Sequence, residues 1–250
     1  MRQAFVLAVL SLLALTAPTA ARDALPAGFV YLREVDASIA QDMRYASHDN
    51  FVGRPLPGYA ASECVLRQAV AEALAKVQAE LAQQQLSLKV YDCYRPRRAV
   101  AAMMRWADDG ARGAPSKRFF PKLDKRTLFA QGYIAAQSVH STGAAIDLTL
   151  IRLPAAAVAA FDPAVPYGPC TGPASARAPD NSMDMGTGFD CFDVKSYTLS
   201  RAISPEQRRW RSVLVGAMRH HGFKNYFREW WHFTYGAREP SQDFAIGARR

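Results

Sequence analysis

Two cysteines bracket an amphipathic helix and the strand that follows it, and this unit constrains the fold more than any other feature of the chain. Apolar side chains recur with helical spacing from Ser62 onward, and residues 86–94 form a strand-like run. A helix of about 22 residues runs roughly 33 Å, and a strand of about eight residues returns about 27 Å. Antiparallel packing would therefore bring Cys64 next to Cys93, and we expect a disulfide between them.

The N-terminal segment indicates that the cysteines are oxidised. Arg2 precedes an apolar run over residues 4–15, and small residues follow at 17–21, which is the pattern of a secretory signal cut near Ala20 or Ala21. A dozen apolar residues cannot span about 30 Å of hydrocarbon as a helix, which argues against a membrane anchor. We expect residues 1–21 to be a signal peptide and the mature protein to be periplasmic or secreted.

Export favours disulfides for an even number of cysteines. Cys170 and Cys191 flank a loop rich in Pro, Gly and Ala, so they form the second expected bridge. Free buried thiols are the alternative. A cysteine-ligated zinc site is disfavoured because the chain has no CxxC pair.

The formal net charge of +9 raises the question of a nucleic-acid or membrane partner. The basic residues are scattered, and no run or aromatic-interleaved stripe concentrates them. This favours a basic, solvated surface. We expect no nucleic-acid partner, no obligate protein partner, and no stable membrane insertion after signal cleavage.

Local patterns predict a single α+β domain over residues 22–250, with a central, mainly antiparallel sheet and flanking helices. Beyond the first unit, the expected elements are a helix after Pro96, a turn and strand over 138–150, a helix from a capping box at Ser204 to Gly222, and a strand-prone stretch over 226–236. A basic linker over 109–125 and a loop over 152–187 separate them.

His140 and Asp147 are the first candidate metal ligands. Zinc in a hydrolase usually takes three protein ligands and leaves one position for water, but the chain has no HExxH helix. His140 lies in a small-residue turn, and Asp147 lies inside a strand whose apolar residues alternate with it. A carboxylate inside an apolar strand is costly unless it is paired or coordinated. Bonding of Asp147 to backbone amides is the alternative.

The stretch "EWWHF" supplies the second candidate pair, Glu229 and His232. Residues three apart in a regular strand point to opposite faces, so a shared site requires a bulge or bend here. Aromatic neighbours should raise the pKa of Glu229 toward neutrality, which suits a general base. A surface pair between Glu229 and Arg228, with His232 satisfied in the core, is the alternative.

The remaining histidines carry weaker signals. His220 and His221 stand at the end of the predicted last helix, where the helix dipole favours a cation. That effect accounts for one of them. From residue types alone, His48 belongs to no metal-binding or catalytic pattern.

Taken in order, five stretches resemble the VanX-type zinc D-alanyl-D-alanine dipeptidases, from about residue 35 to residue 235. "SVHSTGAAIDLTL" is similar to their SxHxxGxAxD zinc motif, "EWWHF" to their second zinc motif and "YDCYRP" to their arginine motif, while "DMRYASHDNFVG" and "DMGTGFDCFD" look like further family segments. The resemblance implies one Zn²⁺ per chain, in a cleft on the sheet, held by His140, Asp147 and His232. It also implies Glu229 as the base and Arg95 as the group that stabilises the transition state.

The same resemblance implies hydrolysis of the dipeptide D-alanyl-D-alanine to two D-alanines in the cell envelope, linked to peptidoglycan turnover. A closed pocket that binds both substrate ends would reject longer chains. Asp184 looks suited to the substrate ammonium, and Ser138 and Tyr45 look placed for hydrogen bonds to the substrate.

Residues 154–180 look longer than the usual family connection and are expected to reshape the pocket mouth. Two other readings stay open. A zinc D,D-carboxypeptidase acting on murein stem peptides would need an open groove on the amino side of the scissile bond. A cell-wall binding module would be expected to lack a ligand, the base or the arginine, and all five residues are present.

Overall fold

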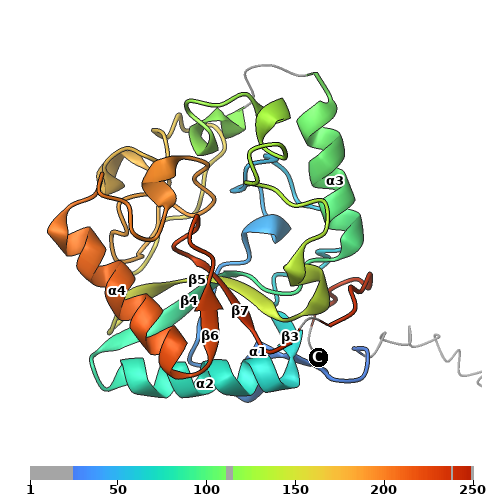
Figure 1. Ribbon diagram of the computed structural model, residues 1–250, viewed down its shortest axis with the longest axis vertical. Coiled ribbons are helices and arrows are strands. Elements are labelled where there is room, and N and C mark those ends of the chain that lie inside the picture. The colour runs from blue at the N-terminus through green and yellow to red at the C-terminus, as the bar shows by residue number, and fades with distance from the viewer. Residues whose placement is uncertain (1–24, 111–114, 238, 249–250) are drawn as a thin grey trace, which may run out of the picture.

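The computed structural model describes residues 25–110, 115–237 and 239–248 (Figure 1). The predicted signal peptide, residues 1–21, lies outside the described residues, so that prediction is untested. No helix within the described ranges is both long and apolar enough to cross a membrane.

A mixed sheet of five strands in the order β2-β4-β5-β7-β6 forms the centre of the fold. The strands are β2 (Ala40–Gln41), β4 (Leu86–Asp92), β5 (Ala145–Arg152), β6 (Phe223–Asn225) and β7 (His232–Tyr235). Only β2 pairs in parallel, with β4; the other neighbours are antiparallel. The predicted α+β class and mainly antiparallel sheet are confirmed.

A small antiparallel sheet joins β1 (Phe29–Tyr31) to β3 (Val65–Arg67). It explains why the first long helix, α2 (Gln68–Ala82), starts later than Ser62, where the apolar pattern placed it. The residues before Gln68 gain a partner strand from a distant part of the chain, and such long-range pairing overrides local periodicity. The predicted helix start was therefore wrong.

The other helices are α1 (Leu32–Val35), α3 (Arg97–Asp108) and α4 (Pro205–His220), with short 3-10 turns η1 (Arg44–Ala46), η2 (Pro115–Phe119), η3 (Lys125–Thr127), η4 (Val139–Thr142), η5 (Ala174–Ala176) and η6 (Val194–Ser196). Of these, α3 and α4 begin where local signals placed them, whereas α1 and the short 3-10 turns were not predicted as helices. Helix α3 follows Pro96 directly. At α4 the side chains of Ser204 and Gln207 form the expected capping box.

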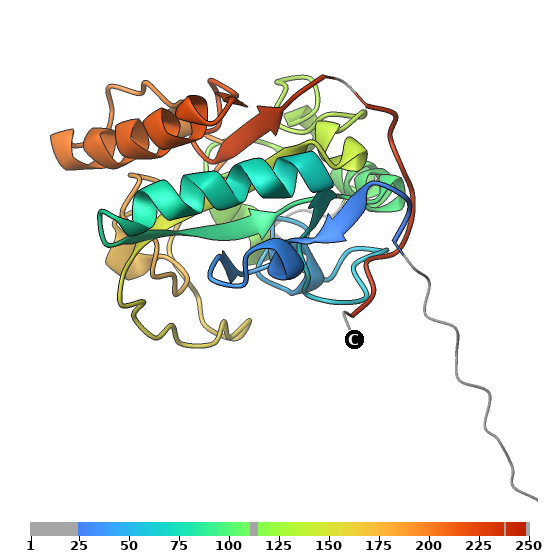
Figure 2. The same cartoon turned by 90° about the horizontal axis from the view of Figure 1, so that it is seen from below.

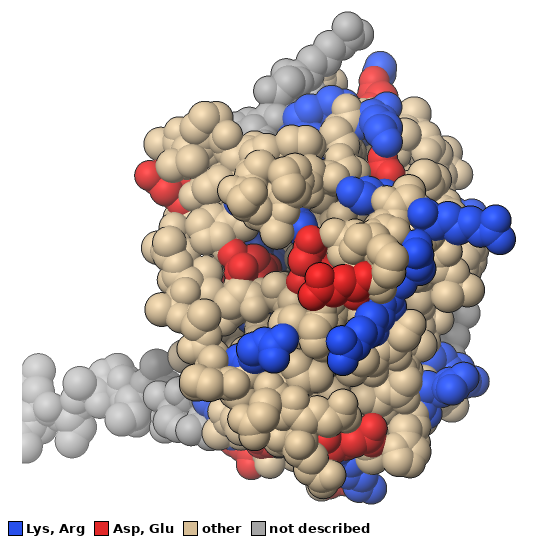
Figure 3. Space-filling view, turned by 90° about the vertical axis from the view of Figure 1, so that its left-hand side faces the viewer, with Lys and Arg blue, Asp and Glu red and all other residues tan. Residues whose placement is uncertain are grey.

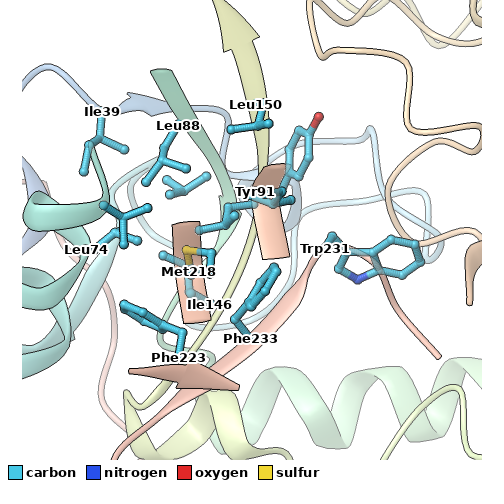
Figure 4. Packing of buried hydrophobic residues seen from close by; sticks show 14 of the residues in the cluster. Ile39, Leu74, Leu88, Tyr91, Ile146, Leu150, Met218, Phe223, Trp231 and Phe233 are labelled. Atoms are coloured by element: carbon cyan, nitrogen blue, oxygen red, sulfur yellow. The ribbon is translucent and has the colours of Figure 1, made fainter. Parts of the chain in front are cut away.

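Helices α2 and α4 lie side by side on one face of the sheet (Figures 1 and 2). Ile146, Leu148 and Leu150 of β5 point into the core beneath them, where Figure 4 shows Leu74 of α2 and Met218 of α4 near Leu88 and Ile146. Truncating one such buried side chain to alanine typically costs about 2–5 kcal/mol. Because side chains alternate along a strand, Asp147 faces the other side of the sheet.

A second apolar cluster covers that other side. It gathers residues from η1, α3 and the irregular segments, among them Tyr45, Phe51, Trp106, Phe119 and Phe192. All but the last residue of β5 are buried. Asp147 therefore lies inside the protein, between the sheet and this aromatic layer.

Both predicted disulfides are present, Cys64–Cys93 and Cys170–Cys191, with Cα–Cα distances of 5.4 and 5.5 Å. Cys93 directly follows β4 and Cys64 directly precedes β3, so the first bridge ties the central sheet to the small one. The second bridge anchors the loop between β5 and α4.

Part of the positive charge is internal rather than on the surface. Arg44, Lys89, Arg95, Lys125 and Arg211 are all buried. On the face shown in Figure 3, acidic side chains gather in a central hollow and Lys and Arg side chains are spread around it. This distribution agrees with the scattered basic residues of the sequence.

Candidate metal centre

The register of the sheet places three ionisable side chains in one row. Asp92 at the end of β4 stands opposite Asp147 of β5, and Asp147 stands opposite His232 at the start of β7. Opposed residues of neighbouring strands project to the same face, with Cβ atoms about 5 Å apart. A register shift between Val90 and Asp92 brings Asp92 into this row.

His140 joins the row from the turn η4, which precedes β5. The side chain of Ser138 accepts a hydrogen bond from the His140 amide at 3.3 Å and so caps the turn. Gly143 ends it with φ +77°, and a Cβ there would collide with the ring of Phe29. The small residues that surround His140 in the sequence therefore serve to fold this turn tightly over Asp147.

Three side-chain atoms converge on a single point. His140 Nε2 lies 3.1 Å from His232 Nδ1 and 3.3 Å from Asp147 Oδ1, and His232 Nδ1 lies 2.9 Å from the same oxygen. Ligands about 2.0–2.1 Å from a tetrahedral ion stand about 3.3 Å from one another. The arrangement thus fits a metal ion held by two imidazoles and one carboxylate.

Buried hydrogen bonds orient these ligands. The Nδ1–H of His140 donates to the carbonyl oxygen of Cys93 at 2.7 Å. The lone pair of Nε2 is therefore available to bind a metal ion. The Oδ2 of Asp92 lies 3.4 Å from the same Nδ1, and its Oδ1 accepts from Tyr59 at 2.6 Å. His140 and Asp147 each expose only 2% of their surface.

Glu229 lies in a tight turn before β7 rather than in a strand. The amide of Glu229 donates to the carbonyl of Tyr226, and the amide of His232 donates to the carbonyl of Glu229. The bend that a shared site required is therefore present, and Glu229 Oε2 lies 3.9 Å from His232 Nδ1. Burial, reinforced by the negative charge of Asp147, raises the pKa of Glu229 to about 8.

Arg95 is fixed beside the same row. Its Nε and a terminal nitrogen bind Asp92 Oδ2 at 2.9 and 2.7 Å, and the terminal nitrogen lies 3.6 Å from Asp147 Oδ2. The guanidinium also stacks over the ring of Tyr45, with its carbon 4.8 Å from the ring centroid. The permanently charged guanidinium is thus held next to the three candidate ligand atoms.

A pocket of about 210 Å³ opens at the three ligands. Its lining includes Tyr45, Arg95, Ser138 and Glu229, so these predicted residues and the ligands share one site. Asp184 is not part of that lining. Its carboxylate instead accepts bonds from Arg177 at 2.5 Å and Gln207 at 2.8 Å, next to a different hollow.

Two carboxylates of the site escaped the sequence reasoning. Asp190 lines the pocket and accepts from the Tyr45 hydroxyl at 2.7 Å; burial and the neighbouring Asp147 raise its pKa well above the ordinary value. Asp92 holds Arg95 in place. Asp190 lies in the stretch "DMGTGFDCFD" and Asp92 in "YDCYRP", both of which resemble family segments. Burying a carboxylate among apolar residues is costly, and this cost could have identified both as candidate site residues.

The long connection over residues 154–180 lines two other hollows, with Arg177, Asp180 and Tyr167 among its contributions. Among the described residues around the metal-binding pocket, none comes from this connection. The expected reshaping of the pocket mouth is therefore not seen in the lining of this site.

Comparison with known proteins gives a consistent result. A family described as D-ala-D-ala dipeptidase matches residues 26–160 and 177–245. The chain is 34% identical over 207 residues to the D-alanyl-D-alanine dipeptidase of Enterococcus faecium, covering 83% of this chain and 91% of that one. It is 32% identical to the enzyme of that name from Streptomyces coelicolor, over 86% and 94%, and 29% identical to the one from Escherichia coli, over 77% and 76%.

Proposed function

The chain belongs to the D-alanyl-D-alanine dipeptidase family of metallopeptidases, and from this we propose that it hydrolyses D-alanyl-D-alanine to two D-alanines with one bound Zn²⁺. The observation that carries the proposal is the buried triangle of His140, Asp147 and His232, with Glu229 and Arg95 beside it. All five residues lie within the matched ranges.

The donor set supports zinc as the ion. Two imidazoles and one carboxylate suit Zn²⁺, and three protein ligands leave a coordination position for the reaction. When bound, the ion polarises the peptide carbonyl and makes water a stronger nucleophile. The hydrogen bond from His140 to Cys93 fixes the tautomer that ligation needs.

Glu229 is the proposed general base. Its carboxylate takes a proton from the attacking water and returns it to the amine of the leaving D-alanine. A group that must accept and then donate a proton works best with a pKa near the operating pH, and burial moves the pKa of Glu229 in that direction. The turn before β7 places the carboxylate 3.9 Å from His232 Nδ1.

Arg95 is the proposed stabiliser of the developing negative charge. Attack on the carbonyl carbon moves charge onto the carbonyl oxygen, where a fixed donor is most effective. Two bonds to Asp92 prevent the guanidinium from swinging away. Because Asp92 is fully buried, this orientation is set before substrate binds.

The substrate ammonium is proposed to bind at Asp190 rather than at Asp184, because only Asp190 belongs to the lining of the metal-binding pocket. Its bond from Tyr45 orients the carboxyl group. Ser138, which also lines this pocket, is proposed to hydrogen-bond the dipeptide. A pocket of about 210 Å³ is smaller than the roughly 300–1,000 Å³ of drug-sized ligand sites, which favours a small substrate.

We place this activity outside the cytoplasm. The signal-like start of the sequence and the two disulfides both support export. There the enzyme would consume D-alanyl-D-alanine released by peptidoglycan turnover. Detection of the mature protein in the cytosol would contradict this part of the proposal.

The direct test compares two substrates for the mature protein with zinc. Free D-alanyl-D-alanine should be hydrolysed, whereas an N-acylated tripeptide ending in D-alanyl-D-alanine should be cut at least about a hundredfold more slowly, because its blocked amine offers no ammonium to Asp190. Asp190→Asn should narrow this preference. Faster cleavage of the blocked tripeptide would instead identify a D,D-carboxypeptidase.

A further inference from the structure

A second group of two histidines and one carboxylate lies on the helical layer, across the sheet from the pocket. His220 Nδ1 and His221 Nε2 lie 2.7 and 2.8 Å from the same oxygen of Glu80. The side chain of His220 is 71% exposed, and those of His221 and Glu80 are 20% and 32% exposed. The three ligand atoms lie within 4.8 Å of one another and open to solvent.

Glu80 lies in the last turn of α2, and His220 is the last residue of α4, so the C-terminal ends of two long helices meet here (Figures 1 and 2). The C-terminal end of each helix carries a partial negative charge that favours a cation. The electrostatics of the backbone therefore add to those of the carboxylate.

The arrangement of the two imidazoles also suits a metal ion. The two imidazoles present one nitrogen each to the same point, although they are consecutive in sequence and come from the helix end and the residue after it. Two imidazoles and a carboxylate are donors typical of first-row divalent metals.

We propose that Glu80, His220 and His221 form a second metal site that binds a divalent first-row transition metal ion, with Zn²⁺ as the reference case. The ion would join the end of α2 to the end of α4. The site is separate from the pocket at His140, since the two groups lie on opposite sides of the sheet. The inference does not rest on the proposed function.

The alternative is a metal-free cluster in which each imidazole donates an N–H to Glu80. The two cases differ in stoichiometry, because a hydrogen-bonded cluster takes up no metal. Untagged mature protein should be stripped with a chelator, titrated with Zn²⁺, and its bound metal counted by calorimetry and elemental analysis. Untagged protein is essential because a histidine tag would bind zinc itself.

Wild type should bind two equivalents of Zn²⁺. His221→Ala and Glu80→Gln should each bind one, and His48→Ala, which removes an exposed histidine elsewhere, should still bind two. In a thermal melt, the second equivalent should raise the Tm of wild type and of His48→Ala but not that of Glu80→Gln. Equal zinc stoichiometries for wild type, His221→Ala and Glu80→Gln would overturn the proposal, whether or not the buried group binds zinc.

Discussion

The two groups of histidines and carboxylates use the same donors in opposite surroundings. Around His140 two of the three ligands are almost fully buried: His140 is contacted by Cys93 and Asp92, and Asp147 by Arg95. Around His220 both imidazoles share one oxygen of Glu80 and the side chains reach solvent. The types of donor atom therefore favour metal binding in both groups. Burial and the supporting contacts favour a catalytic role for the group at His140 alone.

The buried group differs also in what stands next to it. Glu229, the proposed base, and the cationic Arg95 line the same pocket as the candidate ligands. Charges interact more strongly in such a low-dielectric setting than at the surface. We expect large catalytic effects from changes around His140 and small effects on stability alone from changes around His220.

The largest expected effect is that of Glu229→Gln. Removing the base should lower kcat for D-alanyl-D-alanine by about 10²–10⁴-fold, while zinc binding at His140, Asp147 and His232 is retained. Steady-state kinetics with metal analysis on the same sample would measure both. The matched control is His221→Ala, which should keep near wild-type turnover. Activity of Glu229→Gln within tenfold of wild type would remove Glu229 from the mechanism.

Arg95→Lys should lower kcat by about 10²–10³-fold, the range found for loss of one transition-state donor. Lysine keeps the charge but cannot make the two bonds to Asp92 and still face the pocket. The KM for the dipeptide should change less than kcat. A loss confined to KM would assign Arg95 to substrate binding instead.

The metal-free protein should become less stable as pH rises from about 4.5 to about 8. Folded Glu229 keeps its proton up to the higher value, whereas the unfolded chain loses it near 4.5. The unfolded state thus binds fewer protons in this window, so stability falls with rising pH, on the order of 5 kcal/mol in all. In Glu229→Gln the fall measured by urea unfolding should be smaller by this amount, and the raised pKa of Asp190 should account for part of what remains. If the stability of the two proteins changed with pH in the same way, the raised pKa of Glu229 would be contradicted.

The smallest effect is expected at the surface group. Because a hydrogen bond from His220 lowers the pKa of Glu80, its contribution is complete above the ordinary range of a glutamate and is lost as pH falls through the lowered value. Exposed pairs of this kind contribute about 0–1 kcal/mol. Metal-free wild type should exceed Glu80→Gln slightly in Tm at neutral pH and match it at strongly acidic pH. A difference in Tm between wild type and Glu80→Gln that increased as the pH was lowered would contradict this prediction.

Local sequence patterns were enough for much of the fold. Capping signals at Ser204 and Gly222 and the restriction after Pro96 act within a few residues, so α3 and α4 could be predicted. The start of α2 could not, because Val65 to Arg67 pair with a strand far away in sequence. Cys64 and Cys93 were still paired correctly, since β4 returns along α2 whichever residue begins the helix.

Site residues could be predicted from the sequence where a charged residue stands in an apolar segment, because burying a charge is costly. Asp147 within an apolar strand and Glu229 among aromatic residues stood out for that reason. The sequence could not show that Asp190 rather than Asp184 lines the pocket. Both lie in one irregular segment, and its path depends on tertiary contacts such as the Arg177–Asp184 and Tyr45–Asp190 pairs. The surface group at Glu80 was also hidden, since it joins residues from two separate helices.

The most direct test of the account is a zinc titration of the chelator-stripped protein, followed by D-alanyl-D-alanine turnover at each step. Activity should rise to a plateau at one equivalent of Zn²⁺ in wild type and in His221→Ala alike, and should stay at background in His140→Ala. That result would assign the chemistry to the buried group. Activity that reached its plateau only with a second equivalent, or that survived in His140→Ala, would contradict it.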